Sequence, residues 1–265
     1  MTAASTPYGQ LETQLRQRRE LGVKSLVVYL TGGLPGWLDM VRAAADAGAD
    51  AIEIGIPFSD PVMDGPIIQE ASDRALAAGA TPPSILAEAA TLDAGVPLSV
   101  MTYYNLVYRF GLERFAQTAA ESGVCAAILP DLPLEESGEW CAAADAAGIE
   151  TVMLAAPTAP PERLPRICAR ARGFVYGVGL LGITGERDSL ALSALDIAGR
   201  LKAVTDVPVL VGVGISTPQQ AVETCAVADG VIVGSAVVRR ALEVGTPEGV
   251  ADLVAEFRAA LDAKC

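Results

Sequence analysis

Histidine is missing from the 265 residues of this chain. Its absence removes the commonest general base, the Ser-His-Asp triad and most catalytic zinc sites. The 5 cysteines are widely spread and form no CxxC pair, so neither a disulfide framework nor a zinc site is indicated. Any proton transfer must therefore fall to carboxylates, Tyr, Cys or Lys.

Basic residues are scarce as well. The chain has 19 Lys and Arg against 32 Asp and Glu, a formal net charge of −13. This charge opposes binding to nucleic acid or to an anionic membrane, because both present phosphates that need a basic face. The first twenty residues are too polar for a signal peptide, and no run of about 18 apolar residues follows. We therefore expect a cytoplasmic protein that binds a small molecule.

Hydrophobic residues are abundant, at 51% of the chain, and they recur in short β-branched runs that are typical of buried strands. Between these runs lie Ala-rich amphipathic stretches that predict helices, such as 37–47, 112–122 and 218–227. Several helices are expected to end at glycines, at positions 48, 95 and 148. The eight predicted strands are 26–30, 51–54, 98–101, 126–129, 151–154, 174–178, 207–211 and 230–233.

Strict alternation of strand and helix indicates a parallel sheet covered by helices, and eight such units have the size of a closed (β/α)8 TIM barrel. An open, doubly wound sheet is the alternative. No linker or charge block divides the chain, so residues 1–265 are predicted to form a single barrel domain. An extra helix, about Tyr8 to Leu21, precedes the first strand and is expected to cover the bottom of the barrel.

Glu53 is the first candidate for chemistry, because it interrupts the apolar run AIEIGIPF of the second predicted strand. A carboxylate in a dry interior either finds a cationic partner or has a raised pKa that suits proton transfer near neutrality. A buried ion pair or a wet cavity would explain it equally well. Its place at the end of a barrel strand favours catalysis.

Asp64 lies in the long interval between the second and third predicted strands, in the proline-rich segment PFSDPVMDGP. Long loops at the ends of barrel strands often carry function. An Asp before a Gly is also a common turn former, and Asp60 in the same segment has an even stronger explanation as a turn or cap residue. Asp64 is the second candidate carboxylate.

Two glycine loops, VGVGIS (211–216) and IVGSAV (232–237), follow the seventh and eighth predicted strands. In many barrels these two loops bind a phosphate through backbone N–H groups and the N-terminus of a short helix. Individually, such residues are more often helix caps. Their occurrence after both strands makes Gly214, Gly234 and Ser235 candidate phosphate-binding residues.

The segment GVGLLG, residues 177–182, matches the GxGxxG pattern of dinucleotide-binding proteins. The match is weak, because another polar glycine loop follows where that pattern requires a helix. We interpret residues 182–185 as a lid over the site, with Thr184 as a hydrogen-bond donor.

Together, the segments IEIGIPFSDPVMDGPIIQEA, TYYNLVYRFG, LPDLPLEES, GITG, VGVGIS and VGSAVV resemble the tryptophan synthase alpha-subunit family, in order and across nearly the whole chain. The resemblance implies an eight-stranded barrel that cleaves indole-3-glycerol phosphate to indole and glyceraldehyde 3-phosphate without a metal or organic cofactor. It also implies a pyridoxal-phosphate-dependent beta subunit as partner in an alpha2beta2 heterotetramer, with Asp60 and Asn105 as candidate coupling residues.

The resemblance also implies roles for individual residues. Glu53 matches the family's general acid/base, which protonates the indole ring at C3, and Asp64 matches the carboxylate that receives the indole N–H. Tyr176 matches a tyrosine that lines the site. The residues that match the family's phosphate-binding loops are Gly185, Gly214, Gly234 and Ser235.

Two segments depart from the family's pattern. Residues 179–181 read GLL where a polar Ser-Arg type segment is common, and Leu34 replaces a frequent Asp in the first loop. Both are expected near the site or its lid, so they bear on lid closure and partner coupling. A stand-alone lyase that releases free indole is therefore one alternative, and a non-catalytic activator of a beta-type partner is another.

Overall fold

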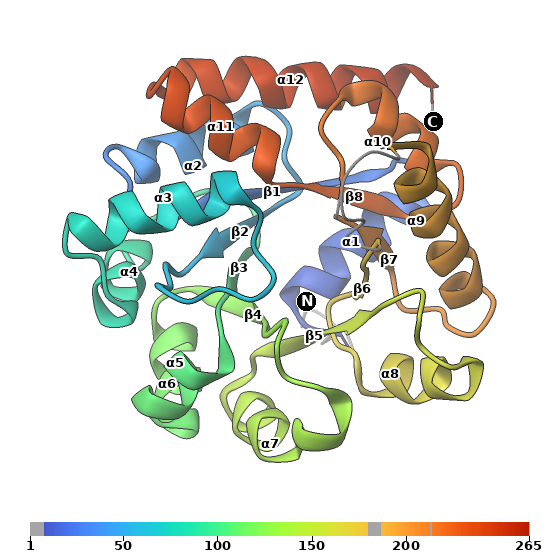
Figure 1. Cartoon of the computed structure of the whole chain (residues 1–265), viewed down its shortest axis with the longest axis horizontal. Helices are drawn as coiled ribbons and strands as arrows, with labels where there is room; N and C mark the ends of the chain where they lie inside the picture. The colour runs from blue at the N-terminus through green and yellow to red at the C-terminus, as the bar shows by residue number, and fades with distance from the viewer. Residues whose placement is uncertain (1–7, 180–186, 213, 265) are drawn as a thin grey trace, which may run out of the picture.

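A computed structural model of the chain describes residues 8–179, 187–212 and 214–264. Within these ranges, parallel strands pair in sequence order and β8 also pairs with β1, which closes the sheet into a barrel (Figure 1). The closed barrel confirms the predicted fold, and the open doubly wound alternative is wrong. The strands are β1 (Ser25–Thr31), β2 (Ala51–Gly55), β3 (Leu98–Met101), β4 (Val124–Ile128), β5 (Glu150–Ala155), β6 (Val175–Gly177), β7 (Val209–Val211) and β8 (Gly230–Val233).

Helices form the outer layer around the barrel (Figure 1). None of the helices in the described parts of the chain is both long and apolar enough to cross a membrane. Two short 3-10 turns, η1 (Leu134–Glu136) and η2 (Pro161–Arg163), accompany them. The helices are α1 (Gln10–Glu20), α2 (Trp37–Asp46), α3 (Pro66–Ala77), α4 (Pro82–Ala89), α5 (Tyr104–Phe110), α6 (Leu112–Glu121), α7 (Gly138–Ala147), α8 (Leu164–Arg170), α9 (Arg187–Lys202), α10 (Pro218–Cys225), α11 (Ser235–Glu243) and α12 (Pro247–Lys264).

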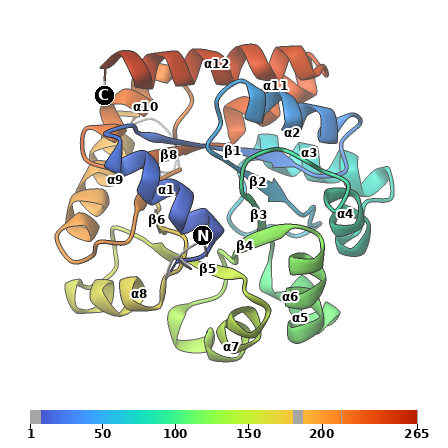
Figure 2. The ribbon, with the colours of Figure 1, turned by 180° about the vertical axis from the view of Figure 1, so that it is seen from behind.

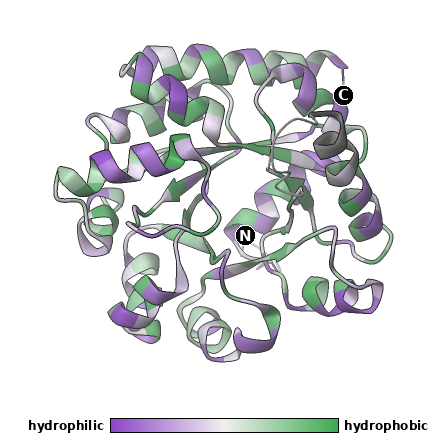
Figure 3. Ribbon diagram, viewed as in Figure 1, coloured by the Kyte–Doolittle hydropathy of each residue, from purple (hydrophilic) through white to green (hydrophobic). Residues whose placement is uncertain are grey.

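The hydrophobic pattern explains this layering. All seven residues of β1 are buried, as expected for a strand with the barrel interior on one face and helices on the other. In α6 the buried residues are Leu112, Phe115, Ala116 and Ala119, which form one stripe at helical spacing. Figure 3 shows the same division, with hydrophobic strands inside and hydrophilic stretches on the outer helices.

Two of the three glycines predicted to end helices do so. Gly148 caps α7 in the left-handed region at φ 74°, and Gly48 follows the C-cap of α2 at φ 107°. The prediction for Gly95 is wrong, because α4 ends at Ala89 and Gly95 instead forms the turn before β3.

The predicted N-terminal helix is α1, and it lies across the barrel in the view from behind (Figure 2). Its side chains Leu11 and Leu15 are buried. Its first turn is capped by Glu150 at the start of β5, whose carboxylate accepts hydrogen bonds from the N–H groups of Leu11 (2.7 Å) and Glu12 (3.0 Å). Helix α1 therefore covers the N-terminal end of the barrel and leaves the opposite end for the site.

The long interval between β2 and β3 holds a loop, residues 56–65, followed by α3 and α4. Pro66 begins α3 at a position that tolerates the missing N–H group. The loop therefore starts where β2 ends and runs over the C-terminal end of the barrel.

Candidate active site

A cavity of about 250 Å³ opens at the C-terminal ends of the strands and gathers the principal sequence candidates. Glu53, Asp64, Tyr176, Gly214, Gly234 and Ser235 all line it. Apolar contributions come from Met63, Ile68, Met101 and Ile232, so the cavity is lined by both polar and apolar groups. Such a lining is typical of small-molecule sites.

Glu53 lies in the middle of β2 and not at its end as predicted, paired in register with Tyr29 of β1 and Ser99 of β3. Its side chain is 1% exposed, and its Oε2 atom has no hydrogen-bond partner. Burial, and secondarily the negative charge of Asp64, raise the pKa of Glu53 from 4.5 to about 8. The carboxyl group is therefore protonated at neutral pH and able to exchange a proton there.

Asp64 stands on the loop that follows β2 and is half-buried. Burial raises its pKa, while a side-chain hydrogen bond with Tyr103 opposes that rise. The Gln69 side chain donates a hydrogen bond of 2.7 Å to the backbone carbonyl of Asp64 and so holds the end of the loop. The two carboxyl groups are therefore held differently, because Glu53 is on a strand and Asp64 is on a loop.

Tyr29 and Tyr176 both line the cavity, and each packs against a glycine, Gly55 at the end of β2 or Gly212 directly after β7. The Tyr29 hydroxyl occupies the space that a Cβ on Gly55 would fill, and the Tyr176 hydroxyl does the same at Gly212. Burial raises the pKa of both phenols, so they remain neutral donors beside the carboxyl groups. Tyr176 was a sequence candidate, whereas Tyr29 was missed although it interrupts an apolar strand run.

The two candidate phosphate loops differ at their helix N-termini. Thr217 caps α10 through a reciprocal capping box with Gln220, so the backbone N–H groups of these two residues already donate to side chains of the protein. Helix α11, which starts at Ser235 after Gly234, has no side-chain cap. Its N-terminal N–H groups and dipole are therefore available to an anion in the cavity, where no Lys or Arg is among the lining residues of the described chain.

The remaining sequence candidates lie elsewhere. Thr184 and Gly185 of the predicted lid are outside the described residues, as is most of the GLL segment. Leu34 is buried and lines a different hollow, beside Gly33 and Trp37. Asp60 and Asn105 are exposed.

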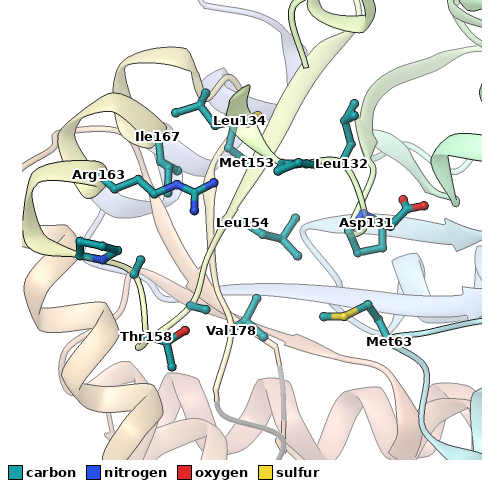
Figure 4. A pocket seen from close by; sticks show the side chains of 15 residues that line it. Met63, Asp131, Leu132, Leu134, Met153, Leu154, Thr158, Arg163, Ile167 and Val178 are labelled. Carbon is teal, nitrogen blue, oxygen red and sulfur yellow. The ribbon is translucent and has the colours of Figure 1, made fainter. Parts of the chain in front are cut away.

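A second, larger cavity of about 420 Å³ lies next to the first and shares Met63 with it (Figure 4). Leu132, Leu154 and Val178 make it largely apolar, and Arg163 extends over it from η2 while donating a hydrogen bond of 2.6 Å to Glu135. It contains neither candidate carboxylate. Among the described residues, no cluster of three or more Cys, Asp or Glu could hold a metal ion.

A closed (β/α)8 barrel that gathers two carboxyl groups and an uncapped helix N-terminus at the C-terminal ends of its strands has the architecture of a barrel enzyme. The sequence model of the tryptophan synthase alpha chain matches residues 15–262. The tryptophan synthase alpha chain of Thermobifida fusca is 43% identical over 96% of both chains. That of Methanosarcina mazei is 46% identical over 88% of this chain and 85% of its own length.

Solved structures agree with the sequence comparison. Tryptophan synthase from Mycobacterium tuberculosis superimposes with a TM-score of 0.88 at 36% identity, covering 96% of this chain and 98% of that one. Tryptophan synthase subunit alpha from Legionella pneumophila gives 0.86 at 32% identity, covering 96% and 99%. The chain belongs to the tryptophan synthase alpha chain family.

Proposed function

We propose that this chain is a carbon–carbon lyase of tryptophan biosynthesis that cleaves indole-3-glycerol phosphate to indole and glyceraldehyde 3-phosphate. The observation that carries the proposal is the meeting of Glu53, Asp64 and the uncapped N-terminus of α11 in one cavity. The reaction needs a proton donor, a stabiliser of positive charge and an anion site, and these three features supply one each.

Glu53 is proposed as the proton shuttle. Its protonated carboxyl group adds a proton to C3 of the indole ring, which turns the ring into a cation. The bond between C3 and the glycerol carbon then breaks, and its electron pair restores the neutral ring. The hydroxyl on the leaving carbon loses its proton to the Glu53 carboxylate and becomes the aldehyde, so Glu53 is regenerated. A pKa of about 8 suits both directions of transfer.

Asp64 is proposed to accept a hydrogen bond from the indole N–H. Protonation at C3 makes that N–H more acidic and places positive charge on the ring, so a carboxylate at this point is bound more strongly by the transition state than by the substrate. Met63, Ile68 and Met101 provide apolar surface for the ring. The phosphate is proposed to bind at Gly234 and Ser235, where the helix dipole replaces a basic side chain.

A beta subunit is the proposed partner, in an alpha2beta2 assembly, and the proposed location is the cytoplasm. Asp60 lies on the loop between β2 and α3, and Asn105 lies in the first turn of α5. Both side chains are exposed, so they can contact a second protein. None of the four cysteines in the described residues forms a disulfide, which suits a reducing compartment.

The experiment that tests the proposed function measures indole released from indole-3-glycerol phosphate, with and without an added tryptophan synthase beta subunit. Slow release by the isolated chain that rises on adding the partner is the expected result. Rapid release with no response to the partner would instead favour the stand-alone lyase, and no release from the isolated chain or the mixture would overturn the lyase proposal.

Alanine at Gly55 or Gly212 is expected to lower indole formation about tenfold, because the new Cβ displaces the hydroxyl of Tyr29 or Tyr176 from its place. Neither glycine has a positive φ, so the loss would come from the side-chain collision and not from backbone strain. Initial rates and thermal unfolding of both variants check this. Gly138→Ala on α7 is the matched control, since nothing lies within 4 Å of its Cβ position. Wild-type rates in both site variants would contradict the assigned packing.

A further inference from the structure

Tyr103 contacts the loop of residues 58–64 at its two ends. It is the second residue after β3 and is 4% exposed. Its ring lies 5.0 Å from that of Phe58, centroid to centroid. Its hydroxyl oxygen accepts a hydrogen bond of 3.1 Å from the N–H of Met63, the residue before Asp64. One buried side chain just after the next strand therefore holds both the start and the end of this loop.

The same hydroxyl also interacts with the Asp64 carboxylate. A phenol has one donor hydrogen and can still accept a hydrogen bond, so Tyr103 can donate to the carboxylate while it accepts from the Met63 N–H. Burial, and then the nearby negative charges, raise the pKa of Tyr103 to about 12, which keeps the hydroxyl protonated as a donor throughout the neutral range.

Glu53 does not need such a contact. It is fixed by β2, which is hydrogen-bonded to β1 on one side and β3 on the other. Asp64 stands on a loop, and sites on loops are placed less precisely than sites on strands unless neighbouring side chains hold them. For Asp64, the Gln69 hydrogen bond restrains only the backbone carbonyl.

We propose that Tyr103 is a positioning residue for the cleavage reaction, which holds the Asp64 carboxylate in place through the contacts with Phe58, Met63 and Asp64. This proposal rests on the role of Asp64 in the proposed function. Tyr103 itself acts through Asp64 and the loop, and need not touch the reacting atoms.

The test compares Tyr103→Phe, Asp64→Asn and the double variant in the indole-release assay. Tyr103→Phe keeps the ring against Phe58 and removes only the hydroxyl, so kcat should fall about tenfold while KM changes less. The loss of a donor to the carboxylate raises the pKa of Asp64, so the acid limb of the kcat/KM profile should move to higher pH. In the Asp64→Asn background, the same change should add less than about twofold.

Two further variants separate positioning from general packing. Phe58→Leu weakens the ring contact but keeps the hydroxyl, so it should leave the acid limb where it is. Tyr108→Phe, the same chemical change at a side chain that is 66% exposed, should match the wild type in rate and profile. Thermal unfolding of every variant shows whether a lost rate reflects lost folding.

The outcomes distinguish the two proposals. A wild-type chain that releases no indole, alone or with a beta subunit, overturns the proposed function whatever Tyr103 does. A wild type that releases indole, with Asp64→Asn impaired but Tyr103→Phe unchanged in rate and acid limb, overturns the positioning role alone. An equal shift of the acid limb in Phe58→Leu also overturns it, because ring packing and not the hydroxyl would then be responsible.

Discussion

Replacing Glu53 by Gln is expected to lower indole formation by about 10²- to 10⁴-fold, while the protein stays folded and still binds glycerol phosphate. Gln has nearly the same shape but can neither give its proton to C3 nor take one from the glycerol hydroxyl. Gly234 and Ser235 of the proposed phosphate site lie after β8, away from the Glu53 position on β2, so binding of the anion should persist. Steady-state indole release and equilibrium binding of glycerol phosphate measure the two properties separately.

Stability should not fall with activity in this variant. A buried carboxyl group whose Oε2 has no hydrogen-bond partner stabilises the fold little, and its ionised form destabilises the fold. Gln removes that ionisation, so the free energy of unfolding at pH 9 should equal or exceed that of the wild type. Retained turnover in Glu53→Gln would contradict the proton-shuttle role.

Glu150→Gln is the matched control for Glu53→Gln. Glu150 is also buried and its pKa is raised to about 6, but it caps α1 at the opposite end of the barrel. A neutral amide accepts the N–H bonds of Leu11 and Glu12 less well than a carboxylate. This variant should therefore lose stability and keep its turnover per folded molecule, the reverse of the result at Glu53.

The fold was predictable because its information is local. Each buried strand is an apolar run, each helix carries one apolar stripe, and the repeat of these units leaves few other architectures. Gly95 shows where this reasoning fails, since a glycine preceded by Asp-Ala looks the same whether it ends a helix or only turns towards the next strand. The difference lies in α4, which ends at Ala89.

The site was predictable only in part, because some of its contacts join residues that are far apart in the sequence. Glu53 breaks an apolar pattern, so it could be found from its neighbours in sequence. Tyr103 gave no such signal, because its hydrogen bond to Met63 joins residues 40 positions apart. The packing of Tyr29 over Gly55 likewise depends on two adjacent strands.

One distinction was present in the sequence and was missed. Thr217 and Gln220 have the spacing of a capping box, which indicates that the N-terminus of α10 is already occupied. No such pattern precedes α11. The glycine loop after β8 could therefore have been ranked above the loop after β7 as an anion site.

The pH dependence of catalysis is the second large effect. If Glu53 must enter the reaction protonated, kcat/KM should fall above its pKa of about 8, tenfold per pH unit and thus about hundredfold at pH 10. The ionised form of Asp64 is required as well, and burial raises its pKa, so the acid limb should lie above the pH of an ordinary Asp. Rates measured from pH 4.5 to 10 test both limbs. An alkaline limb absent below pH 10 would contradict the acid role of Glu53.

The free energy of unfolding should also depend on the ionisation of Glu53. The difference between the folded and unfolded pKa of this group fixes the direction of that dependence. The pKa of Glu53 rises on folding from 4.5 to about 8, so between these values the native protein binds more protons than the unfolded chain. Its stabilising contribution is therefore complete below pH 4.5 and is lost as the pH rises through about 8, by at most about 1.4 kcal/mol per pH unit. Glu53→Gln lacks this contribution, whereas groups distant from Glu53 cancel in the comparison. The unfolding free energy of the wild type minus that of Glu53→Gln, from urea titrations, should decline between pH 5 and pH 8 and level off above pH 9. Parallel curves would mean that Glu53 is ionised in the native protein at neutral pH, and the proton for C3 would then need another source.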